Sequence, residues 1–164
     1  MYKALKLIVT GRVQGVGFRP FIYFVANKYR IVGNVQNNLD RVTIVAEGEE
    51  EALVEMVREI KLNPPPLSKI DEVHIYPVAP SLYHDFTILP SDVSGEALPW
   101  ITADAAICKA CLDELMDPKN RRYCYPFINC TQCGPRYTIT YNLPYDRPNT
   151  TMATFEMCAH CGGI

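Results

Sequence analysis

The N-terminal half of the chain alternates between short apolar runs and apolar stripes at helical spacing. Residues 3–10 are apolar and rich in branched side chains, which is typical of a strand. After Pro20, which suits the first turn of a helix, apolar residues recur with a helical period. Two further strands are predicted at residues 32–36 and 42–47, with a hairpin-like turn at 37–40 between them.

A second helix and two more strands complete this pattern. Acidic residues at 49–51 favour the positive end of a helix dipole, and residues 53–60 carry an apolar stripe. Prolines 64–66 end this helix, and strands are predicted at 70–76 and 86–89. The order strand, helix, strand, strand, helix, strand predicts an α+β fold. We expect a ferredoxin-like βαββαβ antiparallel sandwich, with four or five strands and two helices on one face.

The periodicity is lost after Pro90, where prolines, a glycine and small polar residues follow one another. We interpret residues 91–107 as a linker between a first domain, residues 1–90, and a cysteine-rich region, residues 108–164. The cysteine-rich region has many prolines and too few apolar residues to form a core. We therefore expect a metal ion to organise it.

Four cysteines of this region form two Cys-x-x-Cys pairs with eighteen residues between the pairs. Four thiolates at this spacing can surround one tetrahedral ion, which predicts a zinc finger spanning residues 108–133. Iron accepts the same four ligands, so the choice of zinc rests on general chemistry. Unrelated buried cysteines are the competing interpretation of this spacing. The predicted ligands are Cys108, Cys111, Cys130 and Cys133.

A third pair, Cys158 and Cys161, has no partner pair along the chain. It begins a second finger that is cut short, or it joins the same residues of a second chain in an intermolecular four-cysteine site. Free thiols in a disordered tail are the alternative that we favour. Cys124 falls outside the pattern, as a spare thiol or a core residue, and we interpret His160 as an exposed side chain rather than a ligand.

Charge and cysteine placement narrow the class of protein. The 16 basic and 18 acidic residues give a formal net charge of −2, without the basic excess that binding to nucleic acid requires. The cysteines number seven and all follow residue 107, which argues against a secreted disulfide protein. The apolar start is too short for a signal peptide, and no run is long enough for a membrane span. We expect a cytoplasmic, reduced protein.

A glycine-rich segment, residues 11–19, lies between the first strand and the first helix. Its glycines allow successive backbone N–H groups to face one anion beside a helix N-terminus, and Arg19 can add a two-pronged guanidinium. A tight connection with a surface arginine would have the same composition. No Gly-Lys-Ser/Thr follows, so the segment is not a nucleotide P-loop.

Residues 11–20 are similar to the signature of acylphosphatases, and residues 33–37 resemble the second motif of that family, Gly-x-Val-x-Asn. The resemblance covers residues 3–90. It implies that Arg19 binds the phosphate and that Asn37 orients the attacking water, although asparagine is also common in turns. It further implies phosphate contacts from a run of backbone N–H groups. These belong to Gln14, Gly15, Val16, Gly17, Phe18 and Arg19.

The reaction implied by this resemblance is hydrolysis of a carboxylic–phosphoric mixed anhydride. Water attacks phosphorus in line while the carboxylate leaves. Because the leaving group is a weak base, neither a strong acid nor a metal ion is obligatory. The rate would come from positioning and from donors aimed at the phosphoryl oxygens.

The cysteine-rich region has a second resemblance, carried by residues 108–115, 121–136, 143–147 and 157–158. These segments are similar to the HypF-type carbamoyltransferases of nickel–iron hydrogenase maturation. The resemblance implies carbamoyl phosphate as substrate, and carbamate passed to further domains and then to the C-terminal cysteine of a maturation partner. That carbamoyl group becomes a cyanide ligand of the hydrogenase iron. This chain alone is not expected to complete the transfer.

Two rival functions use the same features. A nucleic-acid-binding zinc protein would share the cysteine spacing, but residues 137–144 carry no basic side chain, and residues 91–164 are net acidic, with six basic and eight acidic residues. A non-catalytic module would bind an anion or a partner protein without turning anything over. Kinetics of Arg19 and Asn37 variants would separate this second rival from the enzyme.

Overall fold

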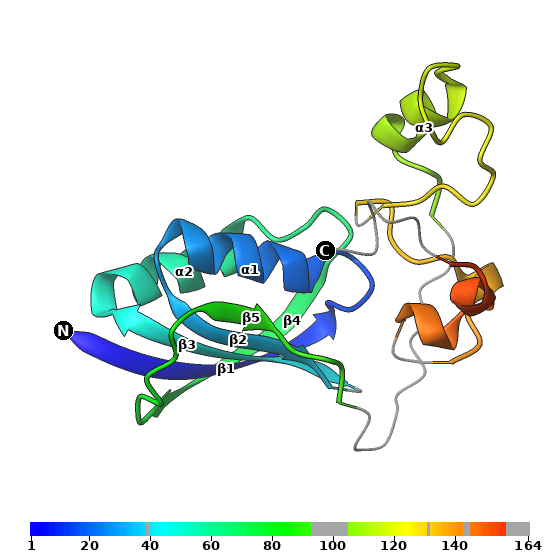
Figure 1. The fold of residues 1–164 in the computed structure, drawn as a ribbon. Coiled ribbons are helices and arrows are strands. Elements are labelled where there is room, and N and C mark those ends of the chain that lie inside the picture. Colours follow the sequence, from blue (N-terminus) through cyan, green and yellow to red (C-terminus); the bar gives the residue numbers. More distant parts are fainter. Residues whose placement is uncertain (39, 93–104, 131, 143–144, 157–164) are drawn as a thin grey trace.

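The computed structural model describes residues 1–164 except 39, 93–104, 131, 143–144 and 157–164. Its larger part is a twisted five-stranded sheet with two helices on one face (Figure 1). The strands are β1 (Tyr2–Arg12), β2 (Val32–Asn37), β3 (Arg41–Glu49), β4 (Lys69–Val78) and β5 (Phe86–Ile88), and the helices are α1 (Phe18–Lys28) and α2 (Glu50–Leu62). This confirms the predicted ferredoxin-like architecture.

The strand order is β4-β1-β3-β2-β5. Strand β1 pairs antiparallel with β3 and β4, and β3 pairs antiparallel with β2. The sheet differs from the wholly antiparallel expectation in one pair, because β5 runs parallel to β2. The reason is topological. Strands β4 and β5 lie at opposite edges, so the chain crosses the end of the sheet between them instead of forming a hairpin.

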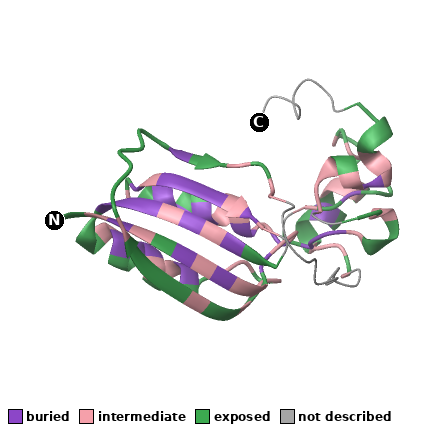
Figure 2. Cartoon of the chain, turned by 90° about the horizontal axis from the view of Figure 1, so that it is seen from below, coloured by how far each residue is buried: buried purple, intermediate pink, exposed green. Residues whose placement is uncertain are grey.

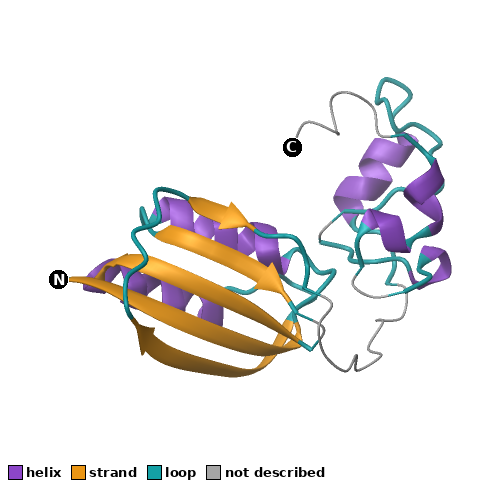
Figure 3. Ribbon diagram, turned by 60° about the horizontal axis from the view of Figure 1, so that its bottom comes forward, coloured by secondary structure: helices purple, strands orange, loops and turns teal. Residues whose placement is uncertain are grey.

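The core lies between the sheet and the two helices. In β1 and β3, alternate side chains such as Leu7, Val9 and Ile44 point toward the helices and are fully buried. Ile22 of α1 and Met56 of α2 are equally buried against them. Figure 2 shows this alternation along the strands, and Figure 3 shows both helices behind the same face. The amphipathic stripes seen in the sequence therefore meet the alternating face of the sheet.

One carboxylate, Glu47, is fully buried at the end of this core. It accepts hydrogen bonds from the backbone N–H groups of Ser81 (2.5 Å) and Leu82 (3.0 Å). These residues lie in the connection that carries the chain from β4 to β5. Glu47 thus ties the crossing segment to the central strand β3.

We predict that Glu47→Gln destabilises the domain. The amide replaces one hydrogen-bond-accepting oxygen by an NH2 group, and this NH2 group would face a backbone N–H. The expected loss is about 1–3 kcal/mol of unfolding free energy. Urea unfolding followed by circular dichroism of the sheet measures it. Glu55→Gln, on the exposed face of α2, is the matched control and should leave the midpoint unchanged. Equal midpoints for the two variants would contradict this role of Glu47.

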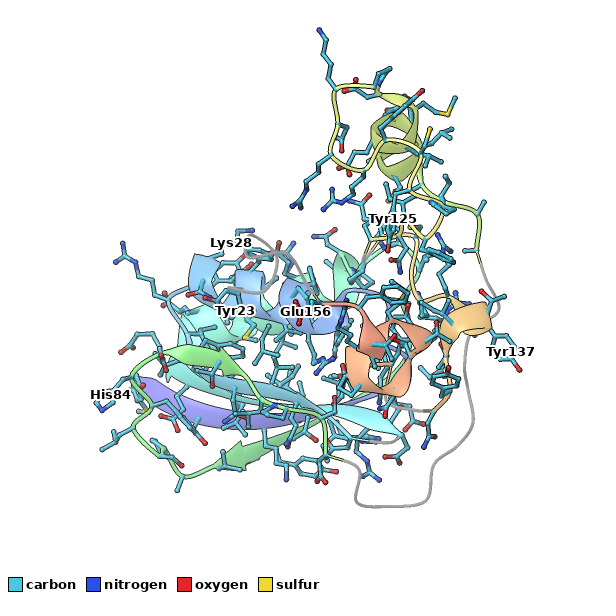
Figure 4. All side chains as sticks on the ribbon, turned by 45° about the vertical axis from the view of Figure 1, so that its right-hand side comes forward. Tyr23, Lys28, His84, Tyr125, Tyr137 and Glu156 are labelled. Carbon is cyan, nitrogen blue, oxygen red and sulfur yellow. The ribbon has the colours of Figure 1, made fainter. Side chains whose placement is uncertain are left out.

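The described residues of the C-terminal part form α3 (Lys109–Met116) and three short 3-10 helices, η1 (Tyr137–Ile139), η2 (Arg147–Asn149) and η3 (Thr151–Thr154). Its buried cluster comprises only Cys111, Ile128 and Cys133 among the described residues. Aromatic side chains such as Tyr125 and Tyr137 remain 39% and 58% exposed (Figure 4). This agrees with the expectation that apolar packing alone does not organise the region.

Several expectations fall on residues outside the described part of the chain. The third cysteine pair, Cys158 and Cys161, lies there together with His160, and so does most of the expected linker at 91–107. The domain limits drawn from the sequence stay predictions. Among the helices of the described residues, none combines the length and apolar character that a bilayer crossing requires.

Candidate functional site

The glycine-rich segment forms a tight loop between β1 and α1. Gly15 and Gly17 adopt left-handed backbone conformations, with φ of 68° and 76°, which glycine reaches without steric cost. Gly17 is also the N-cap of α1. The two glycines therefore turn the chain so that the loop runs directly into the first turn of the helix.

The loop leaves a row of backbone donors without a protein acceptor. Within the described residues, no acceptor takes a hydrogen bond from the N–H groups of Gln14 to Arg19. Two of these groups, those of Phe18 and Arg19, belong to the first turn of α1, where the helix provides no internal acceptor, and Gly17 is the N-cap. Together with the positive end of the helix dipole, they make a concave site that favours an anion.

Arg19 and Asn37 meet beside this loop. Arg19 lies in the first turn of α1 and Asn37 at the end of β2. With the amide oriented so that its oxygen faces the guanidinium, Asn37 accepts from Arg19 Nε (3.0 Å) and Nη2 (3.3 Å). The Asn37 residue is only 3% exposed. The fold thus brings together two residues of two separate sequence motifs.

A cavity of about 310 Å³ opens onto the loop, Arg19 and Asn37. Two of the residues whose backbone N–H groups are expected at the phosphate have their side chains elsewhere: that of Val16 is buried in the core, and Gln14 Nε2 donates to the backbone oxygen of Asn38. Only their backbone N–H groups remain as candidates for an anion. The lining residues are Val13, Gly15, Gly17, Phe18, Arg19, Pro20, Asn37, Asn129, Cys130, Gly134 and Tyr145.

Four of these lining residues come from the cysteine-rich region, and the sequence motifs did not predict them. The two parts pack closely at this point, since a Cβ added to Gly15 would lie 3.1 Å from Pro135 Cγ. These four lining residues lie in the segments 121–136 and 143–147 that carry the HypF resemblance, but nothing in that pattern connects them to the loop. The candidate site is therefore composite.

The four predicted ligand cysteines converge. Their sulfur atoms all lie within 4.8 Å of one another. The Sγ atoms of Cys108 and Cys130 are 3.6 Å apart, and those of Cys111 and Cys133 are 3.9 Å apart. A tetrahedral site with metal–sulfur bonds of about 2.3 Å has sulfur–sulfur edges of about 3.8 Å. The described cysteines fit such a metal, whereas Cys124 is exposed and apart from them.

The surroundings of the sulfur atoms shift the pKa values of Cys111 and Cys133 in opposite directions. Burial, followed by hydrogen bonds among the thiols, raises the pKa of Cys111. Burial also acts to raise the pKa of Cys133, but hydrogen bonds from the backbone of Cys108 and Cys130 outweigh it and lower this pKa to about 7. A bare cluster thus resists carrying four negative charges. A cation at its centre removes that resistance, because it stabilises every thiolate.

Comparison with known proteins agrees with both parts of the chain. Residues 5–88 match the acylphosphatase family, and residues 107–140 match the HypF finger family. The structure of an acylphosphatase from Bacillus subtilis superimposes with a TM-score of 0.52 at 40% identity, covering 54% of this chain and 99% of that one. The chain belongs to the acylphosphatase family. The relation is strong over the ferredoxin-like part, as the two loop motifs predicted.

The similarity to HypF proteins extends through both parts. The carbamoyltransferase HypF2 of Cupriavidus necator is 48% identical over 94% of this chain. A crystal structure of full-length HypF in a phosphate- and nucleotide-bound form has a TM-score of 0.92 at 48% identity and covers 99% of this chain. This chain therefore matches the acylphosphatase and zinc-finger region of HypF. It spans only about a fifth of the length of these relatives (19% and 21%).

Proposed function

We propose that this chain hydrolyses acyl phosphates at the Arg19 and Asn37 site, and that carbamoyl phosphate is its substrate. The observation that carries the proposal is the convergence of the Arg19 guanidinium, the Asn37 amide and the free loop N–H groups on one cavity. The guanidinium and the loop N–H groups supply positive potential for a phosphoryl group, and the Asn37 amide lies beside them.

In the proposed mechanism, the loop N–H groups and Arg19 bind the phosphoryl oxygens. The Asn37 oxygen accepts from Arg19, so its Nδ2 group remains to hold a water molecule through the water oxygen. That water attacks phosphorus in line, forming a new P–O bond while the P–O bond to the acyl group breaks. The leaving carboxylate or carbamate keeps the electron pair and needs no proton, while the proton lost by the attacking water passes to a phosphoryl oxygen of the product phosphate or to solvent. The acceleration of hydrolysis comes from the positioned loop N–H groups and Arg19, which stabilise the charge on the phosphoryl oxygens in the transition state.

The choice of carbamoyl phosphate rests on two supports. The cavity is bounded by Asn129 and Tyr145 of the cysteine-rich region, which favours a compact acyl group with hydrogen-bonding atoms. The HypF relatives are carbamoyltransferases by name. In this proposal, carbamate formed here passes to further domains of such a protein and then to its acceptor, and this chain alone completes only the hydrolytic step.

We also propose that the four-cysteine cluster holds zinc in a structural role. Four thiolate ligands leave no open position for a substrate, which is typical of structural rather than catalytic zinc sites. A reducing compartment such as the cytoplasm would keep these thiols available for the ion. The zinc would then fix the loops that bound the cavity.

A nucleic-acid-binding function is less consistent with the structure of the cysteine-rich region. Two of its arginines have internal partners: Arg122 binds Glu114, and Arg136 donates to the backbone oxygen of Ala105 at 2.6 Å. A non-catalytic anion-binding function remains the second candidate. It would use the same loop and Arg19 but would not depend on Asn37 for turnover.

The first test is kinetic. Arg19→Ala and Asn37→Ala should each lower kcat/KM for carbamoyl phosphate by about 10²–10³-fold, because each removes a group that acts in the transition state. Phosphate release, measured beside acetyl and benzoyl phosphate, gives the rates. Arg58→Ala and Asn27→Ala, both away from the cavity, are matched controls. Equal rates for wild type, Arg19→Ala and Asn37→Ala would reject the enzyme in favour of the non-catalytic module.

The second test concerns the metal. Cys111→Ser should reduce bound zinc by about one equivalent per chain, because it removes a buried ligand of the only thiolate set found among the described residues. Elemental analysis of the purified protein measures this and distinguishes zinc from iron. Cys124→Ser, at an exposed thiol, should retain the metal. Loss of zinc from both variants, or from neither, would contradict the assignment.

A further inference from the structure

The guanidinium of Arg19 has a second set of partners on the side away from Asn37. Its Nη2 lies 2.9 Å from Asp146 Oδ1, and its Nη1 donates to Ser91 Oγ at 3.2 Å. Ser91 Oγ in turn donates to Asp146 Oδ2 at 2.8 Å. The three side chains close a ring of hydrogen bonds. Asp146 belongs to the cysteine-rich region, and Arg19 and Ser91 to the part that precedes it.

Asp146 does not occupy the space where an anion would bind. Arg19 lines two cavities, and Asp146 and Ser91 line the second one, together with residues after β5, but not the cavity of the glycine-rich loop. The carboxylate therefore contacts the Arg19 guanidinium from the second cavity and not from the cavity of the glycine-rich loop. A competitor for the phosphoryl group would have to lie among the loop N–H groups instead.

The ring leaves Arg19 able to bind substrate. A guanidinium has five N–H donors. The contacts with Asn37, Ser91 and Asp146 involve at most four of them, so at least one remains for a phosphoryl oxygen. The arginine side chain is 20% exposed and that of Asp146 is 34% exposed, so the pair is only partly screened by water.

We propose that Asp146 is a positioning residue for Arg19, contributed by the zinc-finger region, with Ser91 as its bridge. This inference rests on the proposed function. A free arginine samples many side-chain rotamers, and binding would have to fix one of them at each turnover. The ring fixes the guanidinium in advance, beside Asn37 and the loop. The cysteine-rich region thus completes the hydrolytic site through an ion pair.

The decisive experiment measures hydrolysis of carbamoyl phosphate and competitive inhibition by inorganic phosphate. Asp146→Ala should lower kcat/KM by about ten- to a hundredfold, the scale of a misplaced catalytic group, and should weaken phosphate inhibition. Asp146→Asn keeps an oxygen toward Arg19 and should lose less than the alanine variant. Asp113→Ala is the matched control, since its carboxylate pairs with Lys109 of the same exposed helix.

A second pair of variants shows whether Asp146 acts through Arg19. In an Arg19→Ala background, adding Asp146→Ala should leave the inhibition constant of phosphate unchanged, because the group that Asp146 positions is gone. A general loss of structure would weaken both backgrounds alike. Ser91→Ala, which lies outside the cysteine-rich region, should reproduce a smaller part of the effect and decides the matter if Asp146→Ala does not fold.

The outcomes separate the two proposals. Wild-type kinetics in Asp146→Ala, or tighter phosphate inhibition as expected of a competing carboxylate, would overturn the positioning role while Arg19→Ala remained impaired. Wild-type kinetics in Arg19→Ala would instead overturn the proposed function itself. Lowered kcat/KM in Asp146→Ala, partial rescue by asparagine and no effect in the Arg19→Ala background support the inference.

Discussion

The contact between Arg19 and Asn37 is the interaction on which the candidate site depends. It joins the first turn of α1 to the end of β2, so two segments that the sheet order brings together become one site. A guanidinium beside a helix N-terminus is electrostatically unfavourable unless an anion or a polar partner balances it. Asn37 and the Asp146 carboxylate supply such partners from within the fold, and the loop N–H groups remain for an oxyanion.

The cysteine-rich region gives this site its outer boundary. Asn129, Gly134 and Tyr145 line the cavity beside the glycine-rich loop, and Asp146 pairs with Arg19 at the end of that loop. The geometry requires Gly15, because a side chain there would press against Pro135. The same loop thus presents a concave set of N–H donors and also packs against the cysteine-rich region.

Much of the fold could be predicted because its signals are local. The apolar stripes of α1 and α2, the apolar and branched residues of β1 and β3 and the Cys-x-x-Cys spacing all depend on near neighbours. The parallel pairing of β5 could not be predicted from three strand residues, since it depends on where the chain crosses the sheet. The contact of Asp146 with Arg19 spans 127 positions, and no local pattern marks such a pair.

Arg136 links the cysteines to the cavity wall through its side chain and its backbone. Its Nη2 donates to Cys133 Sγ at 3.4 Å, and its backbone N–H donates to Tyr145 Oη at 3.2 Å, one residue before Asp146. If the four cysteines hold zinc as proposed, a chelator that removes the zinc would therefore disturb Arg136 and, through Tyr145 and Asp146, the position of Arg19. Inhibition of this chain by a chelator would accordingly be no proof that a metal takes part in bond cleavage. The loss of hydrolysis would instead reflect loss of the structure that holds the site in place.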